Sequence, residues 1–100
     1  MSFRLIFKPR AEAEIAKAFA WYDQPDIRQG EAFFAELERV ERLITLNPLL
    51  YPEVDPALHR ANLRRFPYSL FYVVDDQVIS VLSCLHQHRD PGERPSTGDT

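Results

Sequence analysis

The chain contains only one cysteine, Cys84, and no apolar run long enough to cross a lipid bilayer. A single cysteine cannot form an internal disulfide and has no neighbouring cysteine to share a zinc ion, which is typical of a reducing compartment. Its surroundings, Val-Leu-Ser-Cys-Leu, predict a small core residue. The N-terminal apolar stretch is too short for the core of a signal peptide. We therefore expect a cytoplasmic protein that does not insert into a membrane.

Lysine is also scarce, because Lys8 and Lys17 are the only two and the formal net charge is −3. The charge is unevenly distributed along the chain. Residues 1–58 hold seven Lys/Arg and ten Asp/Glu, whereas residues 59–89 hold four Arg, two Asp and all three histidines. If the second stretch folds as a sheet, the protein has a cationic sheet edge and an acidic helical side.

A length of 100 residues with 45% hydrophobic content is enough for a single packed core. We expect one domain over residues 1–94, followed by a flexible tail over residues 95–100, which is rich in small and polar residues.

Residues 2–8 alternate with the period of a strand. Pro9 then suits the first turn of a helix, because the N–H that proline lacks would be unpaired there. We predict that this helix runs to about residues 21–23. Its apolar stripe consists of Ala11, Ile15, Ala18, Phe19 and Tyr22.

A second, longer helix is predicted between the turn at residues 23–26 and Pro48. Asp26 or a neighbour can cap its start. Pro48 ends it, because proline removes a helix hydrogen bond and disfavours the helical conformation in the preceding residue. The short connection makes the two helices an antiparallel hairpin. The buried stripe of the second helix consists of Phe33, Leu37, Val40 and Ile44.

The remaining chain predicts a sheet. Three prolines make residues 47–58 an irregular but ordered loop, held in place by apolar side chains. Strands are expected at residues 59–66, 68–75 and 78–85, and the last two form a hairpin. The order β-α-α-β-β-β predicts an α+β fold, with the helical hairpin packed on one face of a mainly antiparallel four-stranded sheet.

His86 and His88 are two residues apart, so both face one side of a continuing strand, as metal ligands on sheets do. No third ligand is evident, and we expect no metal site. A polar strand end, with one imidazole bonded to backbone, and an acid/base or contact role are the alternatives.

The arginines near residue 60 either solubilise an edge strand or contact a partner. Strand alternation favours Arg65 over Arg64 as the residue that touches the core side or an internal carboxylate. Tyr72 and its aromatic neighbours are expected in the core, with one hydroxyl reaching a groove. Trp21 either packs under residues 48–54 or is an exposed anchor for a partner.

Three segments, together with this order of elements, resemble the RelE/ParE toxin superfamily, and most closely its ParE-like, plasmid-stabilisation members. In that family the first helix opens near Ala-x-x-(Asp/Glu)-Ile, one strand reads Phe-Pro-Tyr-x-(Ile/Leu)-Phe-Tyr, and the last strand ends in His-x-x-Arg-(Asp/Asn)-Pro. The segments Ala11–Ile15, Phe66–Tyr72 and His86–Pro91 fit those places. The resemblance covers residues 2–91.

The resemblance implies the toxin of a type II toxin–antitoxin system, with no cofactor, neutralised by a cognate antitoxin whose flexible segment folds onto it. A homodimer or a toxin–antitoxin heterotetramer is compatible with it. ParE-like members inhibit growth by binding DNA gyrase, whereas RelE-like members cut messenger RNA on the ribosome. A homologue that has lost toxicity and persists as a binding module is a third reading.

Physical chemistry favours the gyrase reading over the ribosome. Work on the ribosome favours a strongly basic protein, because phosphate neutralisation dominates affinity, and this chain is acidic. Metal-free RNA cleavage also needs an acid, a base and cations around the phosphate. The candidates for those roles are Arg64, His86, His88 and Arg89. The candidates for binding a target or antitoxin are Arg60, Arg64, Arg65, Tyr72, His86, His88 and Arg89.

Overall fold

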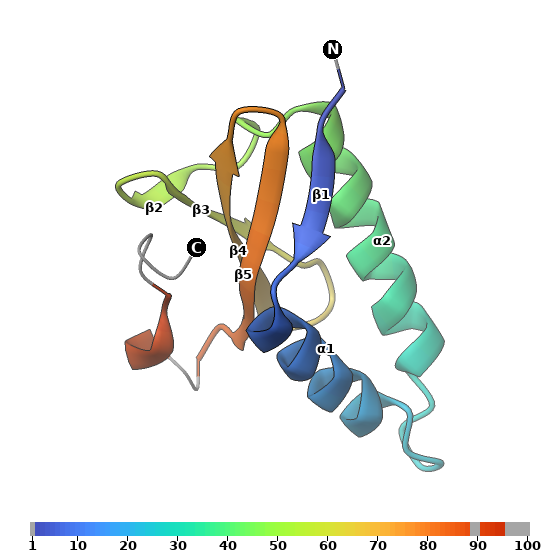
Figure 1. Ribbon diagram of the computed structural model, residues 1–100. Coiled ribbons are helices and arrows are strands. Elements are labelled where there is room, and N and C mark those ends of the chain that lie inside the picture. The colour runs from blue at the N-terminus through green and yellow to red at the C-terminus, as the bar shows by residue number, and fades with distance from the viewer. Residues whose placement is uncertain (1, 89–90, 96–100) are drawn as a thin grey trace.

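The computed structural model describes residues 2–88 and 91–95. Within these residues the chain forms one strand, two helices, four further strands and a short 3-10 turn (Figure 1). The elements are β1 (Arg4–Phe7), α1 (Pro9–Tyr22), α2 (Gly30–Leu46), β2 (Glu53–Asp55), β3 (Leu58–Asn62), β4 (Tyr68–Asp75), β5 (Val78–His86) and η1 (Pro91–Glu93).

The strands form one sheet in the order β1-β5-β4-β3-β2, with β1 parallel to β5 and the other neighbours antiparallel. Both helices lie on the same side of it (Figure 1). The predicted α+β fold, a helical hairpin on one face of a mainly antiparallel sheet, is therefore confirmed. The sheet has five strands among the described residues, where we expected four.

The additional strand is β2, which lies in the segment predicted to be an irregular loop. Glu53 pairs with His59, and the Arg60 N–H donates to the Pro52 carbonyl at 3.0 Å. Pro52 and Pro56 flank the strand, and an edge position tolerates them because an edge strand needs partners on one side only. Because β2 pairs with it, β3 is not the edge strand that we expected.

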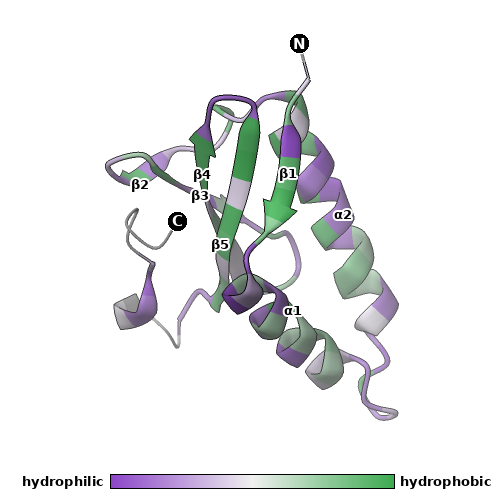
Figure 2. Cartoon of the chain, in the orientation of Figure 1, coloured by the Kyte–Doolittle hydropathy of each residue, from purple (hydrophilic) through white to green (hydrophobic). Residues whose placement is uncertain are grey.

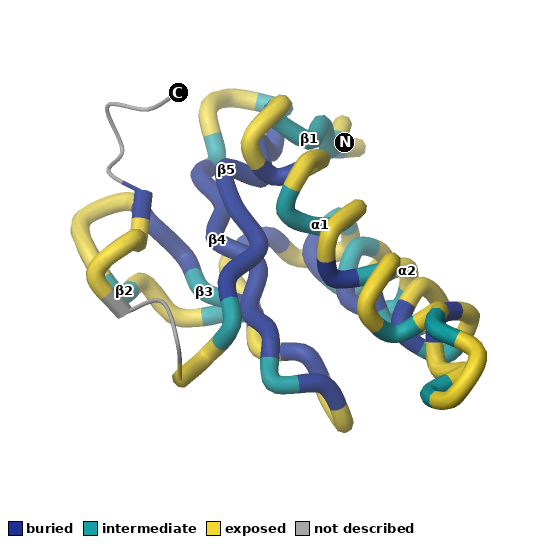
Figure 3. Tube along the Cα trace, turned by 90° about the horizontal axis from the view of Figure 1, so that it is seen from below, coloured by how far each residue is buried: buried dark blue, intermediate teal, exposed yellow. Residues whose placement is uncertain are grey.

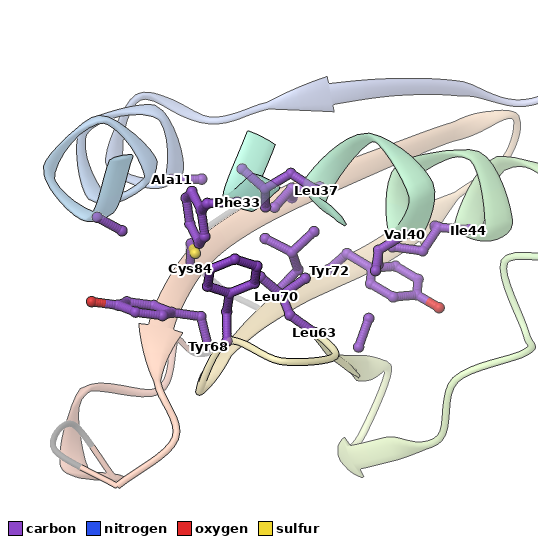
Figure 4. Packing of buried hydrophobic residues seen from close by; sticks show 14 of the residues in the cluster. Ala11, Phe33, Leu37, Val40, Ile44, Leu63, Tyr68, Leu70, Tyr72 and Cys84 are labelled. Carbon is purple, nitrogen blue, oxygen red and sulfur yellow. The ribbon is translucent and has the colours of Figure 1, made fainter. Parts of the chain in front are cut away.

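The core lies between the helices and the sheet (Figure 4). Phe33, Leu37, Val40 and Ile44 are all buried, as the stripe of the second helix predicted. In α1 only Ala11 and Ala18 are fully buried, and the larger members of its stripe are partly exposed. In Figure 2 hydrophobic residues (green) predominate along β4 and β5, whereas hydrophilic residues (purple) recur along α2. In Figure 3 the two strands are mostly buried.

A bulge in β5 changes which side chains face the helices. Phe71 pairs with Ser83 but Tyr72 pairs with Val81, so Leu82 has no opposite residue. Because of this extra residue, Val81 and Cys84 both face the helices despite their odd spacing, while Leu82 joins a second cluster on the far face. Glu14 of α1 accepts a hydrogen bond from the Cys84 N–H at 2.9 Å. Cys84 is a buried core residue, as predicted.

The helix ends agree with the prediction except at the start of α2, and α2 ends at Leu46, just before Pro48, as predicted. Pro9 occupies the first turn of α1. Asp26 does not cap α2, because the helix begins at Gly30 with Gln29 before it and no side-chain cap. Instead, Asp23 lies so close to Gly30 that a Cβ atom there would be 2.5 Å from its Oδ1. Within the described residues, neither helix combines the length and the apolar character needed to cross a membrane.

The loop after α2 is held partly by apolar side chains, as predicted, because Tyr51 packs against the core and Val54 against the second cluster, and partly by two polar side chains. The Tyr72 hydroxyl donates to the Pro48 carbonyl at 2.6 Å, and Nδ1 of His59 lies 2.7 Å from the Tyr51 carbonyl. The His59 and Tyr72 rings stack with centroids 5.0 Å apart. Leu49 and Leu50, in contrast, are exposed.

Candidate functional site

Arg60 and His86 border the same cleft, but the His86 ring lies on the helix side of the sheet, against the ring of its cross-strand partner Tyr68. The cleft has a volume of about 210 Å³, and its walls are formed by β3, β4 and β5. Its apolar part is Phe71 and Leu85, which belong to the second hydrophobic cluster. The remaining lining residues are Ser69, Gln87 and Arg94. The cleft therefore offers two guanidinium groups and an amide to a partner, beside an aromatic ring.

His86 is the last residue of β5, and His88 follows in the turn after it. The His88 N–H donates to Nδ1 of His86 at 3.1 Å, and the two rings are 6.0 Å apart. Nδ1 of His86 therefore acts as an acceptor, so a neutral His86 carries its proton on Nε2. In the part of the chain that the structure describes, no group of three His, Cys, Asp or Glu side chains lies close enough to hold a metal ion.

Arg64 and Arg65 do not line this cleft. Strand β3 ends at Asn62, and Arg65 has a positive φ of 71°. The turn therefore breaks the strand alternation on which the prediction for Arg65 rested, and both arginines are exposed. The internal carboxylate, Glu36, instead accepts a hydrogen bond from the backbone N–H of Arg64. The Arg65 guanidinium lies 5.6 Å from the Phe66 ring centre.

Arg94 was missed by the sequence reasoning, because we counted it only as the end of the domain. It lies within the segment 91–95, which passes beside the cleft. Its Nη1 is 3.3 Å from Oδ2 of Asp55, and its guanidinium lies 5.8 Å from the Phe71 ring centre. The Glu93 carbonyl accepts a hydrogen bond from Arg10 of α1. The sequence signal for an ordered segment around Arg94 was the pair of prolines at 91 and 95, because proline restricts the backbone.

The other predicted residues divide between the core and the surface. Tyr72 is fully buried, with its hydroxyl bound to Pro48, so the structure places it in the core and not in an exposed groove (Figure 4). Trp21 is 58% exposed, which agrees with the exposed alternative rather than with packing under the proline-rich loop. Arg89 lies outside the described residues, as does the tail from residue 96, and Pro95 is buried.

A second and larger cleft, which we did not predict, lies between the two helices. It has a volume of about 730 Å³ and is lined by α1, α2 and the end of β1. Its apolar members include Phe7, Ile15, Phe19, Phe34 and Leu37. Its charged members are all acidic: Glu12, Glu31, Glu38 and Glu41. The exposed Phe34 was the available signal, because it lies next to the buried stripe of α2.

Comparison with known proteins gives one family and several similar structures. The model of the ParE toxin of type II toxin–antitoxin systems, parDE, matches residues 5–91. No curated protein matches the sequence.

Three solved structures show the same fold at low sequence identity. A chain of the chromosomal ParDE TA system from P. aeruginosa is 18% identical with a TM-score of 0.70, over 84% of this chain and 95% of that one. A chain of the toxin–antitoxin complex RelBE2 from Mycobacterium tuberculosis is 20% identical with a TM-score of 0.60, over 86% and 99%. A chain of the archaeal RelE–RelB complex from Pyrococcus horikoshii OT3 is 17% identical with a TM-score of 0.52, over 89% and 99%.

Proposed function

Because the chain belongs to the ParE toxin family of type II toxin–antitoxin systems, we propose that it arrests growth by binding DNA gyrase and is neutralised by a cognate antitoxin. The family match over residues 5–91 carries this proposal. Antitoxins are present in similar structures, such as the RelBE2 complex, which supports the second half of it.

The charge of the chain supports a protein target over a ribosomal one. The net charge is −3 and only Lys8 and Lys17 are lysines, so little of the surface could neutralise ribosomal phosphates. The cleft that Arg60 and His86 border has a volume of about 210 Å³, so it is a small site and not an extended cationic surface. We propose it as the target-binding surface, with Arg94 at its margin, because a few desolvated arginines and aromatics commonly dominate a protein interface.

Supercoiling of a relaxed plasmid by purified gyrase tests the proposal. The wild-type chain should inhibit the reaction, and Arg60→Ala should need roughly tenfold more protein for the same inhibition. Arg4→Ala is the matched control, because Arg4 is exposed on β1 at the opposite edge of the sheet and should leave inhibition unchanged. No inhibition at saturating wild-type protein would reject gyrase as the target.

A ribosome-dependent ribonuclease is the second candidate, favoured by one observation. The rings of His86 and His88 lie 6.0 Å apart at the end of β5, beside the cleft that Arg60 lines, and RNA cleavage without a metal uses imidazoles for proton transfer and cations for charge stabilisation. Primer extension on translated messages would show cuts in this case, and they should disappear in a His86→Ala, Arg89→Ala double variant. Unchanged growth on expression would instead indicate a homologue that binds without being toxic.

A further inference from the structure

The small cleft on the sheet face away from the helices has the features of a carboxylate-binding site. We propose that it holds an aspartate or glutamate side chain of the target, that Arg60 is the main donor to this carboxylate, and that Asp55 of the chain itself competes for Arg94. This inference rests on the proposed function, because it names the chemistry by which the target is recognised and a residue that weakens the recognition.

The Arg60 guanidinium lies in this cleft without a counter-charge. Arg60 is half-buried on β3 and lies opposite Phe71 of β4, so both side chains are on the face of the second cluster. Among residues 2–88 and 91–95 its side chain makes no ion pair and no hydrogen bond. A partly desolvated guanidinium with no carboxylate beside it favours an incoming carboxylate, which can accept two parallel hydrogen bonds from it.

Arg94 brings a second guanidinium to the same cleft. It follows η1, which in Figure 1 lies with β2 on one side of β4 and β5, whereas α2 lies on the other. Its guanidinium is 5.8 Å from the Phe71 ring centre, and its Nη1 is 3.3 Å from Oδ2 of Asp55. This one contact leaves most of its N–H donors unused. Arg60 and Arg94 therefore both neighbour the Phe71 ring, and both have donors for a ligand.

The other lining residues define the class of ligand. None of the described lining residues is acidic, although the whole chain has a net charge of −3. The Ser69 hydroxyl already donates to Asn62, and Nε2 of Gln87 donates to the Tyr68 carbonyl, so the arginines are the main donors that remain. The volume of about 210 Å³ is below the roughly 300–1,000 Å³ of sites for drug-sized ligands. The cleft therefore suits one acidic side chain rather than a nucleotide.

A carboxylate of a protein fits this site better than the phosphates of RNA do. RNA carries a phosphate at every nucleotide, and a groove that binds it has positive charge along the path of the backbone. Here the two cations belong to one small cleft, and Arg64 and Arg65 lie outside its lining. Phe71 and Leu85 add an apolar part to it. An arginine beside an aromatic ring is typical of the dominant contacts in protein interfaces.

Asp55 of β2 indicates the ligand class and also opposes the ligand. It is a carboxylate that already pairs with Arg94, and the Arg94 and Asp55 side chains are 35% and 52% exposed. An exposed pair with a single contact contributes little stability, so a carboxylate of the target can replace it. Until it is replaced, Asp55 occupies Arg94 and repels an acidic partner. Asp55 therefore weakens the binding of the target, and removing its charge should strengthen that binding.

NMR titration of the full chain with two short peptides tests the inference without gyrase and detects weak binding. Both peptides carry leucines beside two test positions, which are glutamate in one peptide and glutamine in the other. The glutamate peptide should bind roughly tenfold more tightly, and the difference should shrink as salt is raised. Arg60→Ala should abolish this preference. Arg60→Lys should keep only part of it, because lysine retains the charge but not the planar fork.

The competing role of Asp55 gives a prediction of the opposite sign. Asp55→Asn should tighten binding of the glutamate peptide about threefold. The gain should disappear in an Arg94→Ala background, because Asp55 acts through Arg94. Asp76→Asn is the matched control and should leave binding unchanged. It removes the same charge in the turn at the other end of the β4–β5 hairpin, and asparagine tolerates the φ of 57° there. Urea unfolding of each variant checks that its fold is intact.

Equal binding of the two peptides, unchanged binding by Arg60→Ala, or unchanged or weaker binding by Asp55→Asn would each overturn the inference. Tighter binding of a single-stranded RNA oligonucleotide with the same number of charges, through Arg60, would also overturn it, because the site would then take phosphate.

Inhibition of gyrase by the wild-type chain is measured separately. If the chain inhibits gyrase but shows no preference for the glutamate peptide, the carboxylate site is wrong and the gyrase proposal stands. If it prefers the glutamate peptide through Arg60 but does not inhibit gyrase, the gyrase proposal fails and the carboxylate site remains.

Discussion

At the scale of single residues, two buried polar side chains fix a loop that lies far from them in sequence. Tyr72 of β4 and His59 of β3 sit opposite each other in the sheet, stack, and hold the carbonyls of Pro48 and Tyr51. Burial without partners would disfavour both groups, so these hydrogen bonds are part of the stability of the core. Burial also raises the pKa of the Tyr72 hydroxyl, which keeps it protonated as a donor.

Removing the Tyr72 hydroxyl should therefore destabilise the protein. In Tyr72→Phe the Pro48 carbonyl loses its donor, and we expect the free energy of unfolding to fall by about 1–2 kcal/mol. Tyr51→Phe is the control, because the Tyr51 hydroxyl makes no hydrogen bond within residues 2–88 and 91–95, and it should change the free energy by less than about 0.5 kcal/mol. Urea denaturation measures both, and equal effects would argue against the Pro48 bond.

The sequence predicts residues well where one local rule decides and poorly where the partner is distant. The buried stripe of α2 follows from helical spacing alone. The hydrogen bond from Tyr72 to Pro48 spans 24 residues, and no local pattern indicates it. The exposure of Arg65 depends on the end of β3 at Asn62 and on the positive φ of Arg65 itself. The alternation of residues along a strand predicts neither.

At the scale of elements, the packing of α1 against α2 depends on a close approach at Gly30. Asp23 follows α1, and its side chain fills the space beside Gly30 at the start of α2. A side chain at that position would displace the chain between the helices, although alanine favours a helix more than glycine does by about 1 kcal/mol.

Gly30 and Gly92 offer a matched test of this approach. In Gly30→Ala the new Cβ would lie 2.5 Å from Oδ1 and 2.9 Å from Cβ of Asp23, so we expect a net loss of roughly 1–2 kcal/mol of stability. In Gly92→Ala the new Cβ meets nothing within 4 Å, and stability should be unchanged. Thermal unfolding followed by circular dichroism compares them, and a stabilised Gly30→Ala would contradict the close approach.

Glu36 joins α2 to the turn between β3 and β4. It accepts two hydrogen bonds from Arg39, at 2.7 and 2.8 Å, and one from the Arg64 N–H. The bond from Arg39 lowers the pKa of Glu36, burial opposes this, and the Arg64 N–H lowers it further. A carboxyl whose pKa is lower in the folded state stabilises the fold above its unfolded pKa, and that stability is lost as the pH falls through the folded value.

Glu36→Gln should therefore destabilise the protein in a pH-dependent way. At pH 7 we expect a loss of about 1–2 kcal/mol, which should shrink as the pH falls below the ordinary pKa of 4.5. Glu38→Gln is the control, because Glu38 is exposed on the same helix and should have little effect. Urea titrations at pH 7 and in mild acid measure the difference, and a loss independent of pH would contradict the assigned cause.

The order and type of the helices and long strands were predictable because each is long and strongly periodic. Strand β2 was not, because it has three residues between prolines and forms only by pairing with β3. The bulge at Leu82 was equally inaccessible, since it depends on the register between β4 and β5. The parallel placement of β1 beside β5 joins the two ends of the chain, and local pattern does not specify it.

At the scale of the whole molecule, the two clefts lie on opposite sides of the sheet. The helical side carries the large apolar cleft with an acidic rim, and the opposite face carries the small cleft with Arg60 and Arg94. The charge asymmetry along the sequence predicted an acidic helical side. It did not predict that the cations would divide, with Arg64 and Arg65 on the turn beside α2 and apart from the lining of the small cleft.

The topology of a reporter plasmid in growing bacteria tests the proposed action on gyrase most directly. The chain is expressed from an inducible promoter, and plasmid topoisomers are separated before and after induction, with Arg60→Ala as the comparison. The account predicts that wild-type induction stops growth while the plasmid loses negative supercoils, and that Arg60→Ala weakens both effects. Unchanged supercoiling in cells that accumulate the folded wild-type chain would contradict it.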